Sequence, residues 1–170
     1  MIKVKTHPNK VSITYWILYN ATVGLSVYWA SNLILWFPWS YSTTLGMILM
    51  LTINPVLWGF ATYLCLRTFP NKNLLKAAFL NSLVFLVMAI LLDYLFFGLI
   101  RGAIKELYHP TTFYGYAFIA CVPFILLLIF RKKIERNKKY IEKTDFIKVG
   151  FTGLMCFFAL TLIIGFGIEI

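Results

Sequence analysis

Charged residues are scarce in this sequence. Only 13% of its 170 residues are charged, against about a quarter in a typical soluble domain, and 61% are hydrophobic. A water-soluble domain of this length cannot bury so much apolar surface, and its exterior would become one adhesive patch. The composition therefore excludes a soluble domain and predicts an integral membrane protein.

Cysteine and histidine are also few. The three cysteines lie in apolar runs with no close-spaced Cys or His partner, which argues against a disulfide or a zinc site. The two histidines, His7 and His109, fall on opposite sides of the membrane in the topology predicted below, which argues against a haem held by both. The chain also lacks a phosphate-binding glycine loop and a nucleophile elbow, so we expect no cofactor and no metal.

Long apolar runs dominate the sequence instead. Five runs approach or exceed the roughly 20 residues that a helix needs to cross the hydrocarbon core. We therefore predict an all-α fold, a single polytopic domain of about five transmembrane helices, and we expect Pro38 to break the first one. The predicted spans are residues 11–37, 43–66, 77–100, 113–130 and 149–168.

The distribution of basic residues predicts the orientation. Of the 16 Lys and Arg, fourteen lie in the N-terminal tail, between the second and third spans, and in the segment 131–148. Only Arg101 and Lys105 lie on the other side. The positive-inside rule then places the N-terminus in the cytoplasm and the C-terminus outside, in a multi-pass protein of the cell membrane. Because the cations sit between apolar runs rather than along one polar face, we expect no nucleic-acid partner despite the net charge of +10.

Asp93 is the only ionisable residue within a predicted span. It lies about 10 Å below the outer end of its helix, at 1.5 Å per residue. A carboxylate at this depth needs a partner, a proton or water, and intramembrane charges often mark functional sites. Two interpretations stay open: a proton or cation site, or a structural pair with Arg101 or Lys105.

The outer connection between the third and fourth spans is short and rich in reactive side chains. We expect the third helix to continue to about Tyr108 and Pro110 to end it. Arg101, Glu106 and His109 would then gather about two turns above Asp93, as a candidate binding site. The alternative is an ordinary polar loop with a solvated histidine.

Two spans carry a proline near the middle. Pro55 follows Asn54 in the second span, and Pro123 lies at the corresponding place in the fourth. Matched proline-interrupted spans favour a transporter site at the midplane, with Asn54 as a candidate ligand, although proline is common in membrane helices for other reasons. Three other polar residues within spans are expected to form hydrogen bonds between helices: Asn20, Asn32 and Asn81.

The segment 131–148 is strongly basic, with scattered apolar residues. We expect a short helix lying on the cytoplasmic leaflet, in contact with anionic lipid. There are two alternatives: a loop whose only role is to fix the topology, and a binding site for an acidic protein. The residues expected to face lipid are Arg131, Lys132, Lys133, Arg136, Lys138 and Lys139.

Three functions fit these observations. We rank first an accessory or interaction subunit of a larger membrane assembly, partnered by another membrane protein or by further copies of the chain. The second is a small oligomeric transporter or channel that uses Asp93 and the proline-broken helices. The third, a membrane enzyme with an outward-facing site around Asp93, Arg101, Glu106 and His109, ranks last because no residue pattern specifies a reaction.

Overall fold

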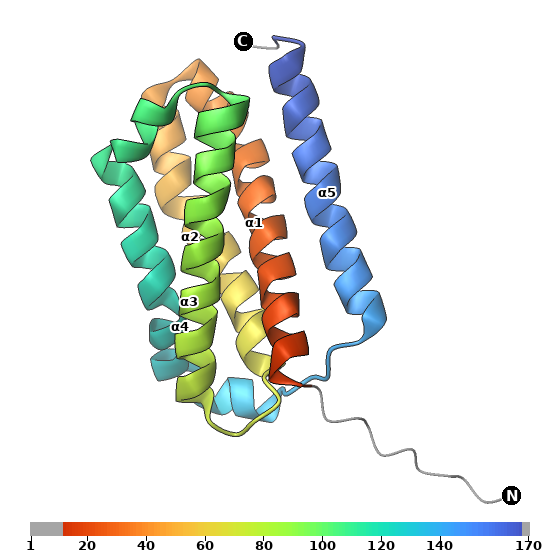
Figure 1. Ribbon diagram of the computed structural model, residues 1–170. Helices are drawn as coiled ribbons and strands as arrows, with labels where there is room; N and C mark the ends of the chain where they lie inside the picture. Colours follow the sequence, from red (N-terminus) through yellow and green to blue (C-terminus); the bar gives the residue numbers. More distant parts are fainter. Residues whose placement is uncertain (1–11, 168–170) are drawn as a thin grey trace, which may run out of the picture.

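The computed structural model describes residues 12–167, apart from the side chain of Glu106 (Figure 1). Over this range the protein is entirely helical, as predicted, with five long helices and two short ones. The described range leaves out the basic residues of the N-terminal tail, Lys3, Lys5 and Lys10. It also leaves out the two outermost residues of the predicted spans, Val11 and Ile168. The long helices are α1 (Ile13–Tyr41), α2 (Thr43–Arg67), α3 (Leu74–Asp93), α4 (Pro110–Arg136) and α5 (Lys143–Gly165); the short ones are η1 (Tyr94–Ile100) and η2 (Ile104–Tyr108).

Four of the described segments are long and apolar enough to cross a membrane: α2, α3 with its extension η1, α4 and α5. Helix α1 is not among them, because polar and aromatic side chains lower its hydropathy. It contacts α2, α3 and α5, and it buries more residues than any other helix (Figure 1). A helix surrounded by protein needs fewer lipid-compatible side chains, so α1 can carry Asn20, Ser26 and Asn32. The five-span count therefore stays a prediction.

The first two helices are separated by a single residue. We expected Pro38 to end the first helix, but this was wrong, because α1 continues to Tyr41 with Pro38 inside it. A proline removes one backbone hydrogen bond without forcing the chain to leave the helix. Ser42 makes the turn: its N–H donates to the carbonyl of Pro38 at 3.0 Å, and its hydroxyl accepts from the N–H of Leu45 at 3.4 Å.

The connection between α3 and α4 differs from the prediction. After Asp93 the helix widens into the π-helix η1, where the N–H of Arg101 reaches the carbonyl of Phe96, five residues earlier, at 2.9 Å. The chain then turns at Gly102, whose φ of 63° favours glycine. The third helix thus ends near Ile100 rather than at Tyr108. Pro110 does not end a helix but begins α4, at a position where its missing N–H has no helical partner to lose.

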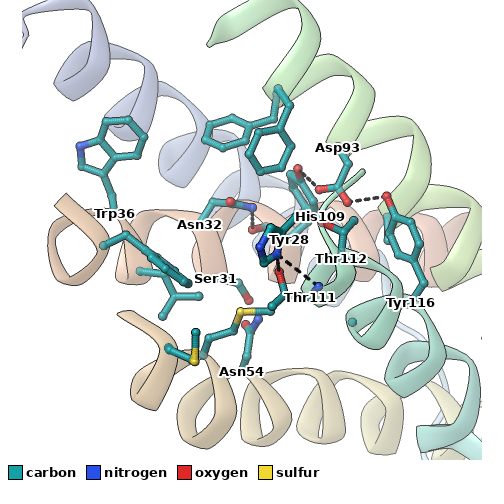
Figure 2. A pocket seen from close by; sticks show the side chains of 18 of the residues that line it. Tyr28, Ser31, Asn32, Trp36, Asn54, Asp93, His109, Thr111, Thr112 and Tyr116 are labelled. Atoms are coloured by element: carbon teal, nitrogen blue, oxygen red, sulfur yellow. Dashed lines mark hydrogen bonds between the residues drawn. The ribbon is translucent and has the colours of Figure 1, made fainter. Parts of the chain in front are cut away.

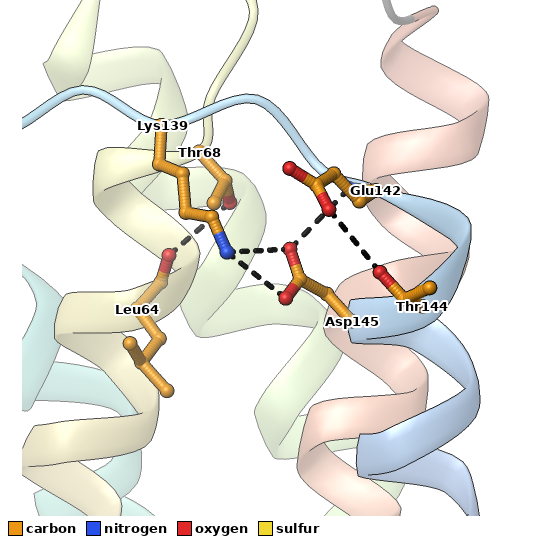
Figure 3. A network of polar contacts seen from close by, with 6 residues as sticks. All are labelled: Leu64, Thr68, Lys139, Glu142, Thr144 and Asp145. Atoms are coloured by element: carbon orange, nitrogen blue, oxygen red, sulfur yellow. Dashed lines mark hydrogen bonds and ion pairs between the residues drawn. The ribbon is translucent and has the colours of Figure 1, made fainter.

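The prediction of a separate surface helix in the basic segment 131–148 was also wrong. Residues 131–136 form the last turns of α4, and residues 137–142 lead to α5, whose start is fixed by reciprocal hydrogen bonds between Glu142 and Asp145. Figure 3 shows Lys139 bound to both carboxylate oxygens of Asp145, at 2.7 and 2.9 Å. The ammonium group of Lys138 donates to the carbonyl of Asn71 at 2.7 Å. A third cation, Arg131, donates to Glu135 at 3.2 Å, so three of the six predicted lipid-facing cations are engaged within the protein.

The connections α2–α3 and α4–α5 meet at one end of the bundle, where the N–H of Lys139 donates to the carbonyl of Arg67 at 3.1 Å. The α1–α2 turn and the α3–α4 connection lie together at the other end (Figure 1). The two basic connections are thus on one side of the bundle, although which side faces the cytoplasm stays a prediction.

Polar side chains join α1 to its neighbours. The amide of Asn81 in α3 donates to the amide oxygen of Asn20 at 2.6 Å, and both residues are fully buried. This confirms two of the three asparagines expected to bond between helices. Asn32 instead donates to the carbonyl of Tyr28 in its own helix at 3.0 Å.

Helix α5 approaches α1 very closely at Gly153. The hydroxyl of Ser26 donates to the carbonyl of Val149 at 2.7 Å. A Cβ atom added at Gly153 would lie 2.5 Å from the Oγ of Ser26 and 2.8 Å from its Cα, nearer than side-chain carbons come. The hydrogen bond therefore depends on glycine at this position.

Replacing Gly153 by alanine should push α5 away from α1. We expect Gly153→Ala to lower the free energy of unfolding by about 1–3 kcal/mol, the usual cost of overpacking, and to lower the melting temperature in detergent. Gly150→Ala is the matched control on the same helix, because its Cβ would meet only the Cγ2 of Thr22, at 3.4 Å. Equal melting temperatures for the two variants would show that the close approach does not hold α5.

Candidate functional site

A cavity of about 1080 Å³ lies within the half of the bundle that carries the α1–α2 turn and the α3–α4 connection (Figure 2). All four helices α1 to α4 contribute to its lining, together with η1 and the connection that follows it. Its exposed polar lining residues define what we call the mouth: Ser40, Thr43, Arg101, Lys105, Tyr108 and His109. The cavity is thus reached from the end of the bundle opposite the basic connections.

The structure brings four of the five predicted site residues into this one lining: Asn54, Asp93, Arg101 and His109. The side chain of the fifth, Glu106, is outside the described part of the chain. Asn54 lies in α2, far from the others in sequence, and Lys105 also contributes to the mouth. Their common location is established by the fold, and their role in binding stays a prediction.

Asp93 is held by two tyrosines from different helices. The hydroxyl of Tyr28 in α1 donates to Oδ1 at 2.6 Å, and that of Tyr116 in α4 donates to Oδ2 at 2.6 Å (Figure 2). The prediction that Asp93 forms a structural pair with Arg101 or Lys105 was therefore wrong, since neither cation bonds to its carboxylate. The change from α3 to the π-helix η1 directly after Asp93 helps to explain this, because it alters the direction of every later side chain.

Arg101 is placed against aromatic rings at the mouth. Its guanidinium carbon lies 5.6 Å from the ring centres of both Trp36 and Phe97. Such cation–π contacts are favourable and fix a planar group over a ring face. Arg101 thereby joins η1 to the end of α1 beside the cavity.

His109 has a local structural role. Its Nδ1 lies 2.8 Å from the hydroxyl of Thr111 and 3.4 Å from the N–H of Thr111, at the start of α4. The residue therefore caps this helix as well as lining the mouth. One of its two ring nitrogens is engaged in this way.

Three buried polar atoms of the lining have no hydrogen-bond partner among the described residues. They are the hydroxyl of Ser31, the indole N–H of Trp36 and the amide oxygen of Asn54. Ser31 is only 4% exposed. Three more atoms of this kind lie away from the cavity, in Thr62, Arg67 and Asn81, so the unpaired atoms are not confined to the lining.

The rest of the inner lining is apolar and aromatic. Trp58 closes the inner end, and its ring packs edge-on against Phe85 with centres 5.4 Å apart. Beyond this pair, toward the basic end, the core is filled by side chains with no exposed surface, including those of Trp16, Cys65 and Leu66. The cavity is therefore closed on that side.

Comparison of the chain with protein-family models, with curated proteins and with solved structures found no match. The geometry alone therefore has to indicate the chemistry. Within residues 12–167 no group of three His, Cys, Asp or Glu side chains is placed to hold a metal ion. The arrangement instead offers hydrogen-bonding groups, aromatic rings and cations around a space of small-molecule size.

Several residues of this site were missed in the sequence. Tyr28 and Tyr116 are 65 and 23 residues from Asp93, and nothing in the sequence pairs them with it. Ser31 was missed because an isolated serine is common in membrane helices. A helical-face count could have found Tyr28 and Ser31, which are three residues apart and so share one face of α1.

The pairing of Asp93 with Tyr116 can be measured as a coupling energy. Tyr116→Phe removes the donor to Oδ2, so we expect unfolding in detergent to become easier by about 1–3 kcal/mol. In an Asp93→Leu background the same change should cost much less, because the acceptor is already gone. Tyr114→Phe, at a 75% exposed position of the same helix, is the control. An equal loss in both backgrounds would contradict the pairing.

Proposed function

We propose that this protein is a multi-pass membrane protein that binds a small molecule in the cavity between α1, α2, α3 and α4. The observation that carries the proposal is the cavity of about 1080 Å³, which four helices line with aromatic rings, hydrogen-bonding side chains and cations. A bundle that served only to pack against a partner would have no reason to leave a space of small-molecule size between its helices. In the topology expected from the basic residues, α1 is a fifth span and the mouth faces the outside of the cell.

A binding role is compatible with the accessory subunit that we ranked first from the sequence. Such a subunit would capture a molecule at the outer face and present it to another protein of the same membrane assembly. The exposed apolar face of α5, which includes Phe151, Leu154 and Phe158, suits either lipid or such a partner.

Transport is the second candidate, because binding from one side is its first step. The position of Asn54 next to Pro55 favours it, since a proline within a helix provides a place to bend. Passage would require Trp58 and Phe85 to separate, because this pair closes the inner end of the cavity. Binding needs no such movement, so the geometry supports it more directly.

An enzyme is supported least. Both oxygens of Asp93 accept hydrogen bonds from tyrosines, and His109 caps α4. The two groups with acid–base chemistry therefore have structural partners already. We propose binding without a chemical reaction.

A substitution that fills the cavity should remove the bound molecule. Gly115 lines the cavity, and an added Cβ there would meet no atom within 4 Å, so a side chain can be introduced at this position. We expect Gly115→Trp to fill part of the cavity with its indole ring. Gly59→Trp is the control, because Gly59 has equally open space but does not line the cavity. Each protein would be purified in mild detergent, and its small molecules extracted and identified by mass spectrometry.

We expect the wild type and Gly59→Trp to retain the same molecule in a fixed ratio to protein, and Gly115→Trp to lose it. Thermal unfolding should show that both variants are folded. Retention of the molecule by Gly115→Trp, or the absence of any retained molecule from the wild type, would contradict binding in this cavity.

A further inference from the structure

The two cations of the cavity lie at its mouth, where solvent reaches them. Both Arg101 and Lys105 are exposed, and both line the cavity. An ammonium or guanidinium group can donate hydrogen bonds but cannot accept them. A molecule that enters through the mouth therefore passes two groups whose partners must be acceptors.

His109 adds a third donor to the mouth. The N–H of Thr111 donates to its Nδ1 at 3.4 Å, so Nδ1 acts as an acceptor. A neutral imidazole then carries its one proton on Nε2, which makes Nε2 a donor. The histidine is exposed, so its ring lies within reach of a molecule at the mouth.

The charges of the described lining separate by depth. Lys105 forms no ion pair with any described residue, and the five N–H groups of Arg101 can serve more than one partner at a time. The acid of the described lining, Asp93, lies about two helical turns deeper than Arg101 and accepts hydrogen bonds from Tyr28 and Tyr116. The mouth therefore favours an anionic group, whereas a negative charge deeper in the cavity would be repelled by Asp93.

The lining also offers a large apolar and aromatic surface. Indole rings, phenyl rings and flexible methionine side chains accommodate apolar bodies of varied shape. These side chains come from α1, α2 and η1: Trp36, Trp39, Met47, Met50, Phe96 and Phe97. One end of a bound molecule can thus be apolar while the other meets the donors of the mouth.

Building on the proposed binding role, we infer that the ligand is an amphipathic anion. Its carboxylate or phosphate group lies at the mouth with Arg101, Lys105 and His109, and its apolar body lies inside the cavity against the aromatic and methionine side chains. A soluble organic anion and an acidic lipid share this chemistry.

A set of probes with one apolar body and four head groups tests this. Naphthylacetate, naphthyl phosphate, naphthylethanol and naphthylethylammonium would each be equilibrated by dialysis with the full chain in phosphatidylcholine nanodiscs, with empty nanodiscs subtracted. We expect the two anions to bind at least about tenfold more tightly than the ammonium probe, because the mouth attracts one charge and repels the other. Raising the ionic strength should weaken the anions and leave the alcohol unchanged.

Variants of Lys105 then locate the anionic group. Lys105→Gln should weaken both anions by about three- to fivefold, the usual size of one exposed charge contact, and Lys105→Glu should weaken them further while it strengthens the ammonium probe. Thermal unfolding should stay unchanged, since this side chain is exposed and has no partner to lose among the described residues. Lys132→Glu is the matched control, because it makes the same charge change at an exposed position of the opposite end.

Competition separates the two sources of the anion. Phosphatidate would be added to the nanodisc, with naphthylethanol as the reporter, because surface charge does not act on an uncharged probe. Displacement of the alcohol assigns an acidic lipid, and unchanged binding of the alcohol assigns a soluble anion.

Tighter binding of the alcohol or the ammonium probe than of the anions would overturn the inferred class. So would an affinity for the anions that Lys105→Glu and Lys132→Glu change equally. If the ammonium or alcohol probe binds best and Gly115→Trp abolishes that binding, the proposed function stands and only the ligand class is wrong. Absence of saturable binding by all four probes would overturn the ligand class as well, and the retained native molecule would then decide the proposed function separately.

Discussion

Polar groups inside a membrane bundle must find partners within the protein, because hydrocarbon offers none. In this chain the constraint acts mainly on α1, the helix with the most polar side chains and the most contacts. Asn20 bonds to Asn81, Ser26 to the carbonyl of Val149, and Tyr28 to Asp93. These three contacts tie α1 to α3 and α5 at successive levels. A further bond joins α1 to α2, from the indole N–H of Trp16 to the carbonyl of Cys65 at 3.0 Å.

The rule is not met everywhere, because six buried polar atoms lack a hydrogen-bond partner among the described residues. Three of these atoms belong to Thr62, Arg67 and Asn81 and lie away from the cavity, although the amide group of Asn81 also donates to Asn20. The other three belong to Ser31, Trp36 and Asn54, which are among the residues that line the cavity. Proteins commonly sacrifice stability at functional sites and recover it elsewhere. The main reason to assign function to the half with the mouth is the cavity that four helices line there.

The fold was predictable to a useful degree because composition and the length of apolar runs are local properties. The second span, expected at residues 43–66, matches α2 at Thr43–Arg67. Prolines were interpreted less well, since Pro38 lies within a helix and Pro110 begins one. A proline shows only that one N–H is missing, and tertiary contacts decide whether the chain continues as a helix. The prediction of a surface helix in the basic segment was wrong for a similar reason. Lys139 and Asp145 form an ion pair in the connection between α4 and α5, and the charge pattern of the segment does not reveal this contact.

The residues of the candidate site also fall into those that the sequence could predict and those that it could not. Asp93 was identifiable because a lone carboxylate in an apolar run is costly wherever it lies. Its tyrosine partners were not, since Tyr28 and Tyr116 become neighbours only when α1 and α4 pack on α3. The cavity itself depends on space left between four helices. Its unpaired atoms can be recognised only once every possible partner has been placed.

Access to Asn54 from one side of the membrane is the most direct test of this account. A single cysteine in place of Asn54, in a chain whose three native cysteines are replaced, would be treated with a charged, membrane-impermeant thiol reagent from each side in turn. We expect labelling from the side that carries His109, and none from the side that carries Lys139, because the mouth opens at one end and Trp58 closes the other. Failure to label from either side, or labelling from the side of Lys139, would contradict a cavity open at the mouth.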